Sequence, residues 1–187
     1  WNHNSLYVSP MTNVTIKNIT ILFAKSNYGF IVLEDYIGSS DKTNIKHLNF
    51  QNFTLNEVAI SASFRSTSSI AISSKSSFTL FLNNSQFQNL QLFDQTIKQT
   101  SASVISFDSL VSNVEILNCH FKFSESSWKS SLFYISANFF LMHHCTFNQI
   151  NYANVTEMNG ITYTYGGVGN FILINMEIKN CTFSKIF

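Results

Sequence analysis

The fold is predicted by the stretch Val114-Glu115-Ile116-Leu117-Asn118-Cys119-His120-Phe121, because its pattern returns along the whole chain. The pattern is two alternating apolar residues, a turn-prone Asn, a Cys, a variable residue and a Phe. The other copies are Asn18-Ile19-Thr20-Ile21, Asn52-Phe53-Thr54-Leu55, Asn84-Ser85-Gln86-Phe87, His144-Cys145-Thr146-Phe147 and Asn180-Cys181-Thr182-Phe183. The chain is therefore built from a repeated unit.

The spacing of the repeats indicates one coil of a solenoid per unit. The Asn or His that anchors each copy stands at 18, 52, 84, 118, 144 and 180, so the steps between copies are 34, 32, 34, 26 and 36 residues. Self-similarity at 20 to 50 residues is typical of solenoids, and about six coils exceed the roughly three that stable stacking needs.

The parity of the apolar residues predicts a bend inside each unit. Val114 and Ile116 alternate as in a strand, and Cys119 and Phe121 alternate again, but the parity shifts by one at the anchor. Asn adopts the left-handed conformation more readily than other non-glycine residues. We therefore expect a ladder of bends between two short strands, with both strands facing their apolar side inward, at Asn18, Asn52, Asn84, Asn118, His144 and Asn180.

A second set of apolar strands follows the anchors. Its members are Phe30-Ile31-Val32-Leu33, Val58-Ala59-Ile60, Val104-Ile105-Ser106-Phe107, Leu132-Phe133-Tyr134-Ile135 and Ile161-Thr162-Tyr163. The Ser-rich segment 61–77 keeps strand alternation at Ile70-Ala71-Ile72, so we interpret it as outward Ser on strands and turns rather than as a linker. Strand, Asn bend, strand, loop and strand describe one turn of a parallel β-helix.

These residues resemble the right-handed parallel β-helix proteins of pectate-lyase type, whose coils carry an Asn bend and internal ladders of like residues. The resemblance covers nearly the whole chain. It implies an all-β solenoid, and it leaves activity open, because such folds host lyases, hydrolases, adhesins and structural proteins. The Asn-, Ile-, Phe-, Ser- and Lys-rich composition also resembles large cell-surface β-helix proteins of AT-rich protist genomes, those of ciliates especially.

Length and composition predict a single β-helix domain over 1–187, in which 1–11 is a lead-in segment. With 187 residues, 45% of them apolar, the chain is long enough for one continuous core. Phe is abundant at 19 copies. The inward repeat positions account for many of them and predict an internal ladder that includes Phe53, Phe87, Phe121, Phe147 and Phe183.

The three cysteines occupy the same place in their repeats, so we expect them to stack as buried thiols. They are Cys119, Cys145 and Cys181. In-register side chains on coils about 4.8 Å apart point the same way, which is poor geometry for a disulfide. The alternative is a metal site with His120, His143 or His144. Neighbours on a strand face opposite sides, however, so Cys119 and His120 cannot bind one ion, and we predict no metal.

Charge argues against several partners and against catalysis. The chain has 11 basic and 10 acidic residues, so no basic stripe is present to bind nucleic acid, and no apolar run approaches the roughly 20 residues of a membrane span. Enzymes of this fold cut acidic polysaccharide with clustered Asp, basic residues or Ca²⁺. Here the outward carboxylates at matching repeat positions are Glu115 and Glu177, about 10 Å apart with Leu141 between them, and Arg65 is the only Arg. We predict neither catalytic residues nor a cofactor.

Six sequons suggest N-linked glycans and an extracellular location. Their Asn residues are Asn13, Asn18, Asn52, Asn83, Asn154 and Asn180. With 22 Asn and 41 Ser or Thr in 187 residues, chance alone gives about five such motifs. Asn18, Asn52 and Asn180 are also bend residues. Asn154 and Asn13 are therefore the preferred glycan acceptors.

The sequence as a whole predicts a non-catalytic structural or adhesive module of an extracellular or cell-surface protein or filament. The alternative is a polysaccharide-binding or polysaccharide-cleaving β-helix. Only Ser184-Lys185-Ile186-Phe187 follows the last repeat, and solenoids normally need polar caps. We therefore expect the last coil to be covered by more of the same polypeptide or by another copy of the chain, stacked end to end.

Overall fold

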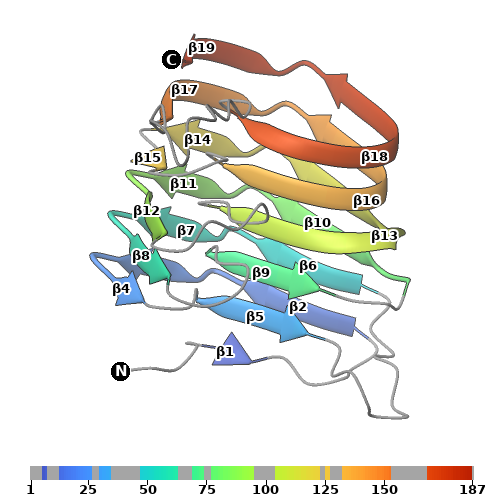
Figure 1. Cartoon of the computed structure of the whole chain (residues 1–187), viewed down its shortest axis with the longest axis horizontal. Helices are drawn as coiled ribbons and strands as arrows, with labels where there is room; N and C mark the ends of the chain where they lie inside the picture. Colours follow the sequence, from blue (N-terminus) through green and yellow to red (C-terminus); the bar gives the residue numbers. More distant parts are fainter. Residues whose placement is uncertain are drawn as a thin grey trace, which may run out of the picture.

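The computed structural model describes residues 6–7, 13–26, 30–34, 47–62, 69–73, 77–94, 104–122, 125–126, 132–152 and 168–186. These residues contain strands and no helix, so the predicted all-β class is confirmed for them. Every strand pairing is parallel, and the strands form two sheets (Figure 1). No helix of the described residues is long and apolar enough to cross a membrane.

Sheet 1 has nine strands and sheet 2 has ten. Sheet 1 contains β1 (Leu6–Tyr7), β2 (Asn13–Lys17), β5 (Ile31–Glu34), β6 (His47–Gln51), β9 (Ile70–Ser73), β10 (Thr79–Asn83), β13 (Ile105–Leu117), β16 (Phe133–His143) and β18 (Gly169–Lys179). Sheet 2 contains β3 (Thr20–Leu22), β4 (Lys25–Ser26), β7 (Thr54–Asn56), β8 (Ala59–Ala62), β11 (Gln86–Gln88), β12 (Gln91–Asp94), β14 (His120–Lys122), β15 (Glu125–Ser126), β17 (Thr146–Tyr152) and β19 (Thr182–Ile186).

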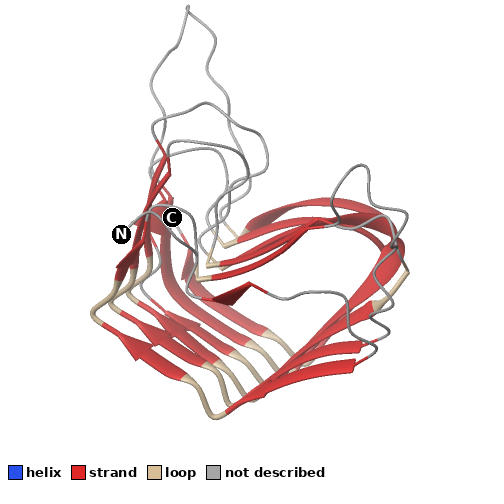
Figure 2. Ribbon diagram, turned by 90° about the horizontal axis from the view of Figure 1, so that it is seen from below, coloured by secondary structure: helices blue, strands red, loops and turns tan. Residues whose placement is uncertain are grey.

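The strands pair in the register that the sequence repeat predicts. One inward row of sheet 1 consists of Ile16, Phe50, Leu82, Ile116, Met142 and Ile178. One inward row of sheet 2 consists of Ile21, Leu55, Phe87, Phe121, Phe147 and Phe183. Each of these residues lies at a fixed offset from its anchor, so consecutive repeats lie directly on one another, as the end-on view shows (Figure 2).

One strand assignment from the sequence is wrong. Val58-Ala59-Ile60 belongs to sheet 2, because β8 pairs with β4 and β12. The counterpart of Ile31 is instead Ile70, in β9, which pairs with β5 and β13. The apolar letters of β8 and β9 are alike, and only the pairing partner distinguishes the two strands. The expected strand at 161–163 lies outside the described residues.

The corner of sheet 1 explains part of the uneven repeat length. In β13 the paired segments are separated by a register irregularity between Ser109 and Asn113. Ser109 pairs with Ala137 of β16, and Asn113 pairs with Phe139. Three residues separate the paired positions in β13 and one separates them in β16, so β13 has two extra residues. The extra residues leave Leu110 54% exposed on the surface. Insertions at this corner therefore lengthen a coil without disturbing the core.

The core is a column of apolar side chains between the two sheets. The inward residues of the middle coils are fully buried, including Phe50, Phe87, Phe121, Phe140 and Phe147. The ring centroids of Phe87 and Phe121 lie 5.3 Å apart, and those of Phe121 and Phe147 lie 4.8 Å apart, both with an interplanar angle of 10°. The predicted burial and stacking of the Phe ladder is therefore confirmed at these residues.

Candidate functional site

The bend predicted at each anchor is present. All six anchors have a positive φ between 49° and 56°: Asn18, Asn52, Asn84, Asn118, His144 and Asn180. His144 takes the conformation at φ 53° like the five Asn residues. The side chains of all six are exposed. These bends fix the angle at which sheet 1 passes into sheet 2, so they set the position of every outward side chain beside them.

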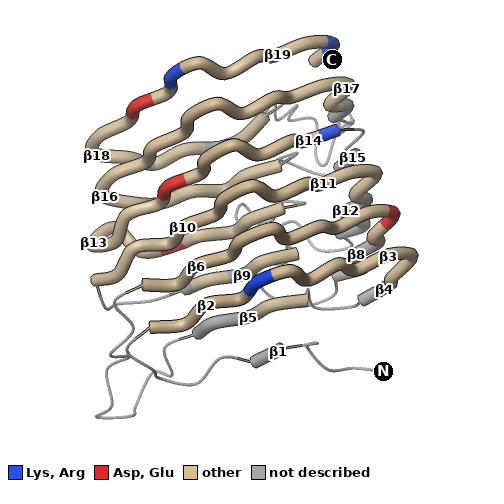
Figure 3. Tube along the Cα trace, turned by 180° about the vertical axis from the view of Figure 1, so that it is seen from behind, with Lys and Arg blue, Asp and Glu red and all other residues tan. Residues whose placement is uncertain are grey.

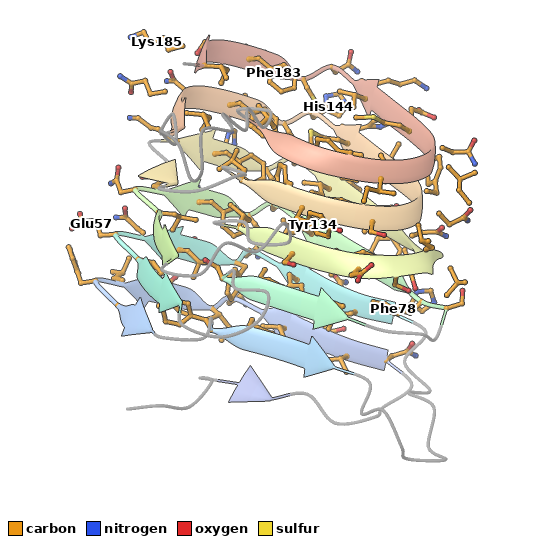
Figure 4. All side chains as sticks on the ribbon, in the orientation of Figure 1. Glu57, Phe78, Tyr134, His144, Phe183 and Lys185 are labelled. Carbon is orange, nitrogen blue, oxygen red and sulfur yellow. The ribbon has the colours of Figure 1, made fainter. Side chains whose placement is uncertain are left out.

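A second ladder of bends follows the first at a distance of five residues, and sequence reasoning missed it. Its described members are Phe23, Glu57, Asn89, Gln149 and Lys185, with φ between 52° and 58°. Figure 4 shows Glu57 and Lys185 at the same outer edge of the stack. Only one of the five is an Asn, so residue type gives no signal. The alternation of apolar residues does indicate the second bend. In the second repeat Phe53 and Leu55 face inward, and the next inward residue is Val58 rather than residue 57.

The thiols lie in the row directly after the first bend, where a small hydrogen-bond donor can reach the chain before the bend. The Cys119 thiol donates to the carbonyl of Leu117 at 3.2 Å, and the Cys145 thiol donates to the carbonyl of His143 at 3.3 Å. The Ser85 hydroxyl makes the same bond, to Asn83 at 2.9 Å. A hydroxyl makes the same bond as a thiol at this row, so the bond does not depend on sulfur, although Ile19 and Phe53 occupy the row in the first two repeats.

All three thiols are free, and two of them are buried as expected. Burial raises the pKa of the Cys119 thiol well above its usual value. Cys181 departs from the expectation because it is only half-buried. It lies in the last described coil, and no described strand pairs with β19 on the side away from β17. The prediction that every thiol is protected in the folded chain is therefore corrected for Cys181.

The Asn side chains form only a partial ladder. The Asn52 amide donates to the Asn18 side-chain oxygen at 2.9 Å, as a continuous ladder requires. The Asn118 amide, however, donates to Asn83 at 3.3 Å and not to Asn84, the bend residue below it. The bend conformation is thus strictly repeated, whereas the side-chain hydrogen bonds adapt to each pair of coils.

The outward carboxylates stand where the repeat places them. Glu115, Leu141 and Glu177 are in register on β13, β16 and β18. Glu177 contacts His143, with 3.1 Å between Oε1 and Nε2, and forms an ion pair with Lys179. The hydrogen bonds from Lys179 and His143 hold the pKa of the Glu177 carboxyl below its usual value. Charged residues are sparse on the described strands and form no continuous stripe (Figure 3).

The histidines near the thiols contact side chains other than the thiols. His120 is exposed on the outer face, opposite the buried Cys119, and its Nδ1 lies 2.6 Å from the Thr146 hydroxyl. The rings of His143 and His144 meet edge to face with centroids 6.2 Å apart. Within the described ranges, no group of three or more His, Cys, Asp or Glu side chains is placed to hold a metal ion.

An outward aromatic ring lies in the middle of the outer face of sheet 1. Phe81 is half-buried there, in register with Asn49 on β6 and Glu115 on β13. Its ring centroid lies 5.8 Å from that of His47. Asn83 follows Phe81 at the next outward position of β10. Amide, carboxylate and imidazole groups therefore surround one partly exposed phenyl ring.

The two end coils expose inward residues that are buried elsewhere. On β18 and β19, Met176, Ile178 and Phe183 are 48%, 41% and 46% exposed. At the other end, Ile19 is 41% exposed, whereas the same row is buried at Phe53. Phe183 still stacks on Phe147, with centroids 4.6 Å apart and planes 3° apart. Figure 4 shows Phe183 in the last coil of the stack. Within the described part of the chain, each end is therefore a layer of core residues with a coil packed on one side only.

The sequons fall mostly on strands and bends. Asn18, Asn52 and Asn180 are the exposed bend residues described above. Asn83 is half-buried and accepts the hydrogen bond from Asn118, whereas Asn13 is exposed at the start of β2. Asn154 lies outside the described residues. In Asn52-Phe53-Thr54 the middle residue faces the core, so its Asn and Thr both lie on the outside.

Comparison with protein-family models, with curated proteins and with solved structures gives no match.

Proposed function

We propose that the chain is a non-catalytic structural or adhesive module, built as a right-handed parallel β-helix of about six coils like the pectate-lyase type. The proposal places it in an extracellular or cell-surface protein. The observation that carries it is the unbroken in-register stacking of the repeats, from Ile21 to Phe183 in sheet 2. A column in which each coil contacts only its neighbours can be lengthened by further coils without any change of contacts.

The outer face supports a structural role better than a catalytic one. Glu115 and Glu177 are separated by Leu141 in one row, at about twice the strand spacing of 4.8 Å. Inverting glycosidases use carboxyl groups roughly 6.5–9.5 Å apart with water between them. Glu177 is also engaged by Lys179 and His143. Holding an ion pair is a stabilising use of this carboxylate and leaves it poorly suited to act as a general acid.

A test of the proposal is incubation of the protein with pectin, alginate and neutral glucans in the presence of Ca²⁺. We expect no new polysaccharide chain ends after prolonged incubation at high protein concentration. New reducing or unsaturated ends that disappear in a Glu177→Gln variant would contradict the non-catalytic proposal. Glu115→Gln removes the other carboxylate of the same row, and loss of the new ends in both variants would show that the two carboxylates act as a pair.

Polysaccharide binding without cleavage is a second candidate, and Phe81 is the observation that favours it. Aromatic rings stack on the apolar face of a sugar, and neighbouring amides can bind its hydroxyl groups. Phe81 has Asn49 and Glu115 in register on either side and the His47 ring 5.8 Å away. Adhesion to a glycan would use this face and leave both ends of the stack free for further coils.

Affinity electrophoresis in gels that contain a soluble polysaccharide measures this binding. If Phe81 stacks on sugar, Phe81→Ala should abolish the retardation of the protein, and Leu141→Ala, which removes another half-buried outward residue of the same row, should not. Equal retardation of wild type and Phe81→Ala would remove this candidate.

A further inference from the structure

We infer that the edge formed by β18 and β19 binds the edge formed by β2 and β3 of a second copy of this chain, head to tail and in register. This inference rests on the proposed structural function and names its partner. We call the edge of β18 and β19 the upper face, and the edge of β2 and β3 the lower face. Within the described residues, each of these strands pairs on one side only.

Backbone hydrogen bonds give the stack a direction. The amide of each anchor donates to the coil above it: Asn84 N to the carbonyl of Leu117 at 3.1 Å, Asn118 N to His143 at 3.0 Å and His144 N to Lys179 at 3.1 Å. The amide of the residue two positions after each anchor donates to the coil below. Thr146 N bonds the carbonyl of Cys119 at 3.0 Å, and Thr182 N bonds that of Cys145 at 2.9 Å.

The two faces are therefore complementary to each other. At the upper face, this pattern leaves the Asn180 N–H as a donor and the Cys181 carbonyl as an acceptor for a further coil. At the lower face, it leaves the Lys17 carbonyl as an acceptor and the Thr20 N–H as a donor, because Lys17 directly precedes the anchor Asn18 and Thr20 follows it by two residues. One register joins both pairs at once, Asn180 to Lys17 and Thr20 to Cys181.

The same register covers the exposed core residues. It places Met176 against Val14, Ile178 against Ile16 and Phe183 against Ile21 of the second copy, because these residues occupy the same inward rows. Met176, Ile178 and Phe183 are each more than two-fifths exposed in the single chain. Removal of such apolar surface from water stabilises association.

Two upper faces cannot make this contact with each other. Turning one copy over makes the facing strands antiparallel and reverses the direction in which the chain bends after Asn180. Sheets 1 and 2 then cannot both continue across the junction. The contact is heterologous, and repetition of a heterologous contact gives an open filament when no ring closes.

One charge opposes the contact. Lys17 of the second copy would lie over Lys179, and like charges on directly opposite residues destabilise a pair of strands. Glu177, which pairs with Lys179, offsets part of this repulsion. Salt screens exposed charges, so assembly should strengthen between low and moderate ionic strength.

The test uses two variants that each block one face. Ile178→Lys places a charge in the upper face and Ile19→Lys places one in the lower face, at residues of equal exposure, 41%. Leu110→Lys is the matched control, because Leu110 is 54% exposed but lies on β13, which pairs on both sides. Sedimentation velocity of the full chain over a 100-fold concentration range gives the masses.

Wild type and Leu110→Lys should form a concentration-dependent series of oligomers, and each blocked variant alone should stay monomeric. An equimolar mixture of the two blocked variants should form a species of twice the chain mass and nothing larger, since one intact upper face and one intact lower face remain. Protection of Cys145 from a thiol reagent shows that each variant is folded. If Ile178→Lys does not fold, Met176→Lys replaces it as the variant that blocks the upper face.

Assembly of either blocked variant alone, or a mixture that stays monomeric while wild type assembles, would show that the contact is not head to tail. A wild-type chain that remains monomeric at every concentration would overturn the inference. With Cys145 still protected, that result leaves the proposed structural module standing without this contact. Cleavage of polysaccharide would instead contradict the proposed function and leave the assembly result unaffected.

Discussion

The ring of Phe121 stacks on the ring of Phe147 in the next coil, with centroids 4.8 Å apart and planes 10° apart. Both rings are 1% exposed. Offset stacking of aromatic rings adds to the stabilisation that burial provides. This contact joins two coils through the interior, so it links the stability of one repeat to that of its neighbour.

Removing this ring should destabilise the whole column. Phe121→Ala leaves a cavity between Phe87 and Phe147, and we expect a loss of about 3–5 kcal/mol in the free energy of unfolding. Urea titration followed by circular dichroism measures it. Phe81→Ala, which removes a half-buried outward ring, is the control and should cost clearly less. A loss below about 1 kcal/mol for Phe121→Ala would mean that its ring is not part of a close-packed core.

The thiols should differ in their rate of labelling. Cys119 and Cys145 are buried and therefore inaccessible. Burial also raises the pKa of the Cys119 thiol, so its reactive thiolate is scarce. The hydrogen bond with Cys119 lowers the pKa of the Cys145 thiol, so burial alone protects that residue. Half-buried Cys181 should react first with a thiol reagent at neutral pH. A Cys181→Ser variant identifies the fast phase.

In the native protein we expect one fast-reacting thiol, and in urea three. Mass spectrometry counts the labels at each time point. Fast labelling of two or three thiols without denaturant, or a disulfide between any pair, would contradict the buried row. Self-association through the upper face should also slow the labelling of Cys181.

The left-handed anchor at residue 118 should favour Asn or Gly over Ala. At φ 52°, Ala in place of Asn118 takes a conformation that costs roughly 1–2 kcal/mol for a residue with a Cβ. Thermal or urea unfolding should therefore show a loss of this size for Asn118→Ala and a smaller loss for Asn118→Gly. Asn49→Ala, on the outer face of β6 and without a positive φ, should be nearly neutral. Equal losses for Ala and Gly would locate the effect in the side-chain hydrogen bond to Asn83.

The Glu177 ion pair should make stability depend on pH in the acid range. Lys179 and His143 lower the pKa of Glu177 in the folded chain. A carboxyl with a lowered folded pKa contributes stability above its unfolded pKa, about 4.3, and that contribution disappears as the pH falls through the folded pKa. Glu177→Gln should reduce stability at pH 6 and leave it nearly unchanged near pH 3.

Urea midpoints measured between pH 3 and pH 6 test this. Because the Glu177 side chain is 37% exposed and solvent screens its ion pair, the change should be small. Glu115→Gln is the control, since no ion pair to Glu115 is present in the described part of the chain. A Glu177→Gln effect of equal size at pH 3 and pH 6 would show that charge is not its cause.

The sequence by itself determined the repeat, the inward rows and the first bend. Side chains alternate with a period of two along a strand, and a bend shifts that parity, so Val114, Ile116, Cys119 and Phe121 indicate which side faces the core. Asn118 marks the bend by residue type, because few other residues take the left-handed conformation readily. Each of these signals is local, so a single repeat is enough to show it.

Only the tertiary structure decided which strand pairs with which, and what each end exposes. Val58-Ala59-Ile60 and Ile70-Ala71-Ile72 look alike in sequence but belong to different sheets, because pairing depends on the neighbouring coil. The second bend at Glu57 and Lys185 has no preferred residue type, since close contact with adjacent coils holds the chain there. Phe183 and Phe147 occupy the same row, yet one is 46% exposed and the other 1%. The difference arises because burial in a stack depends on the coil above, which the local sequence does not contain.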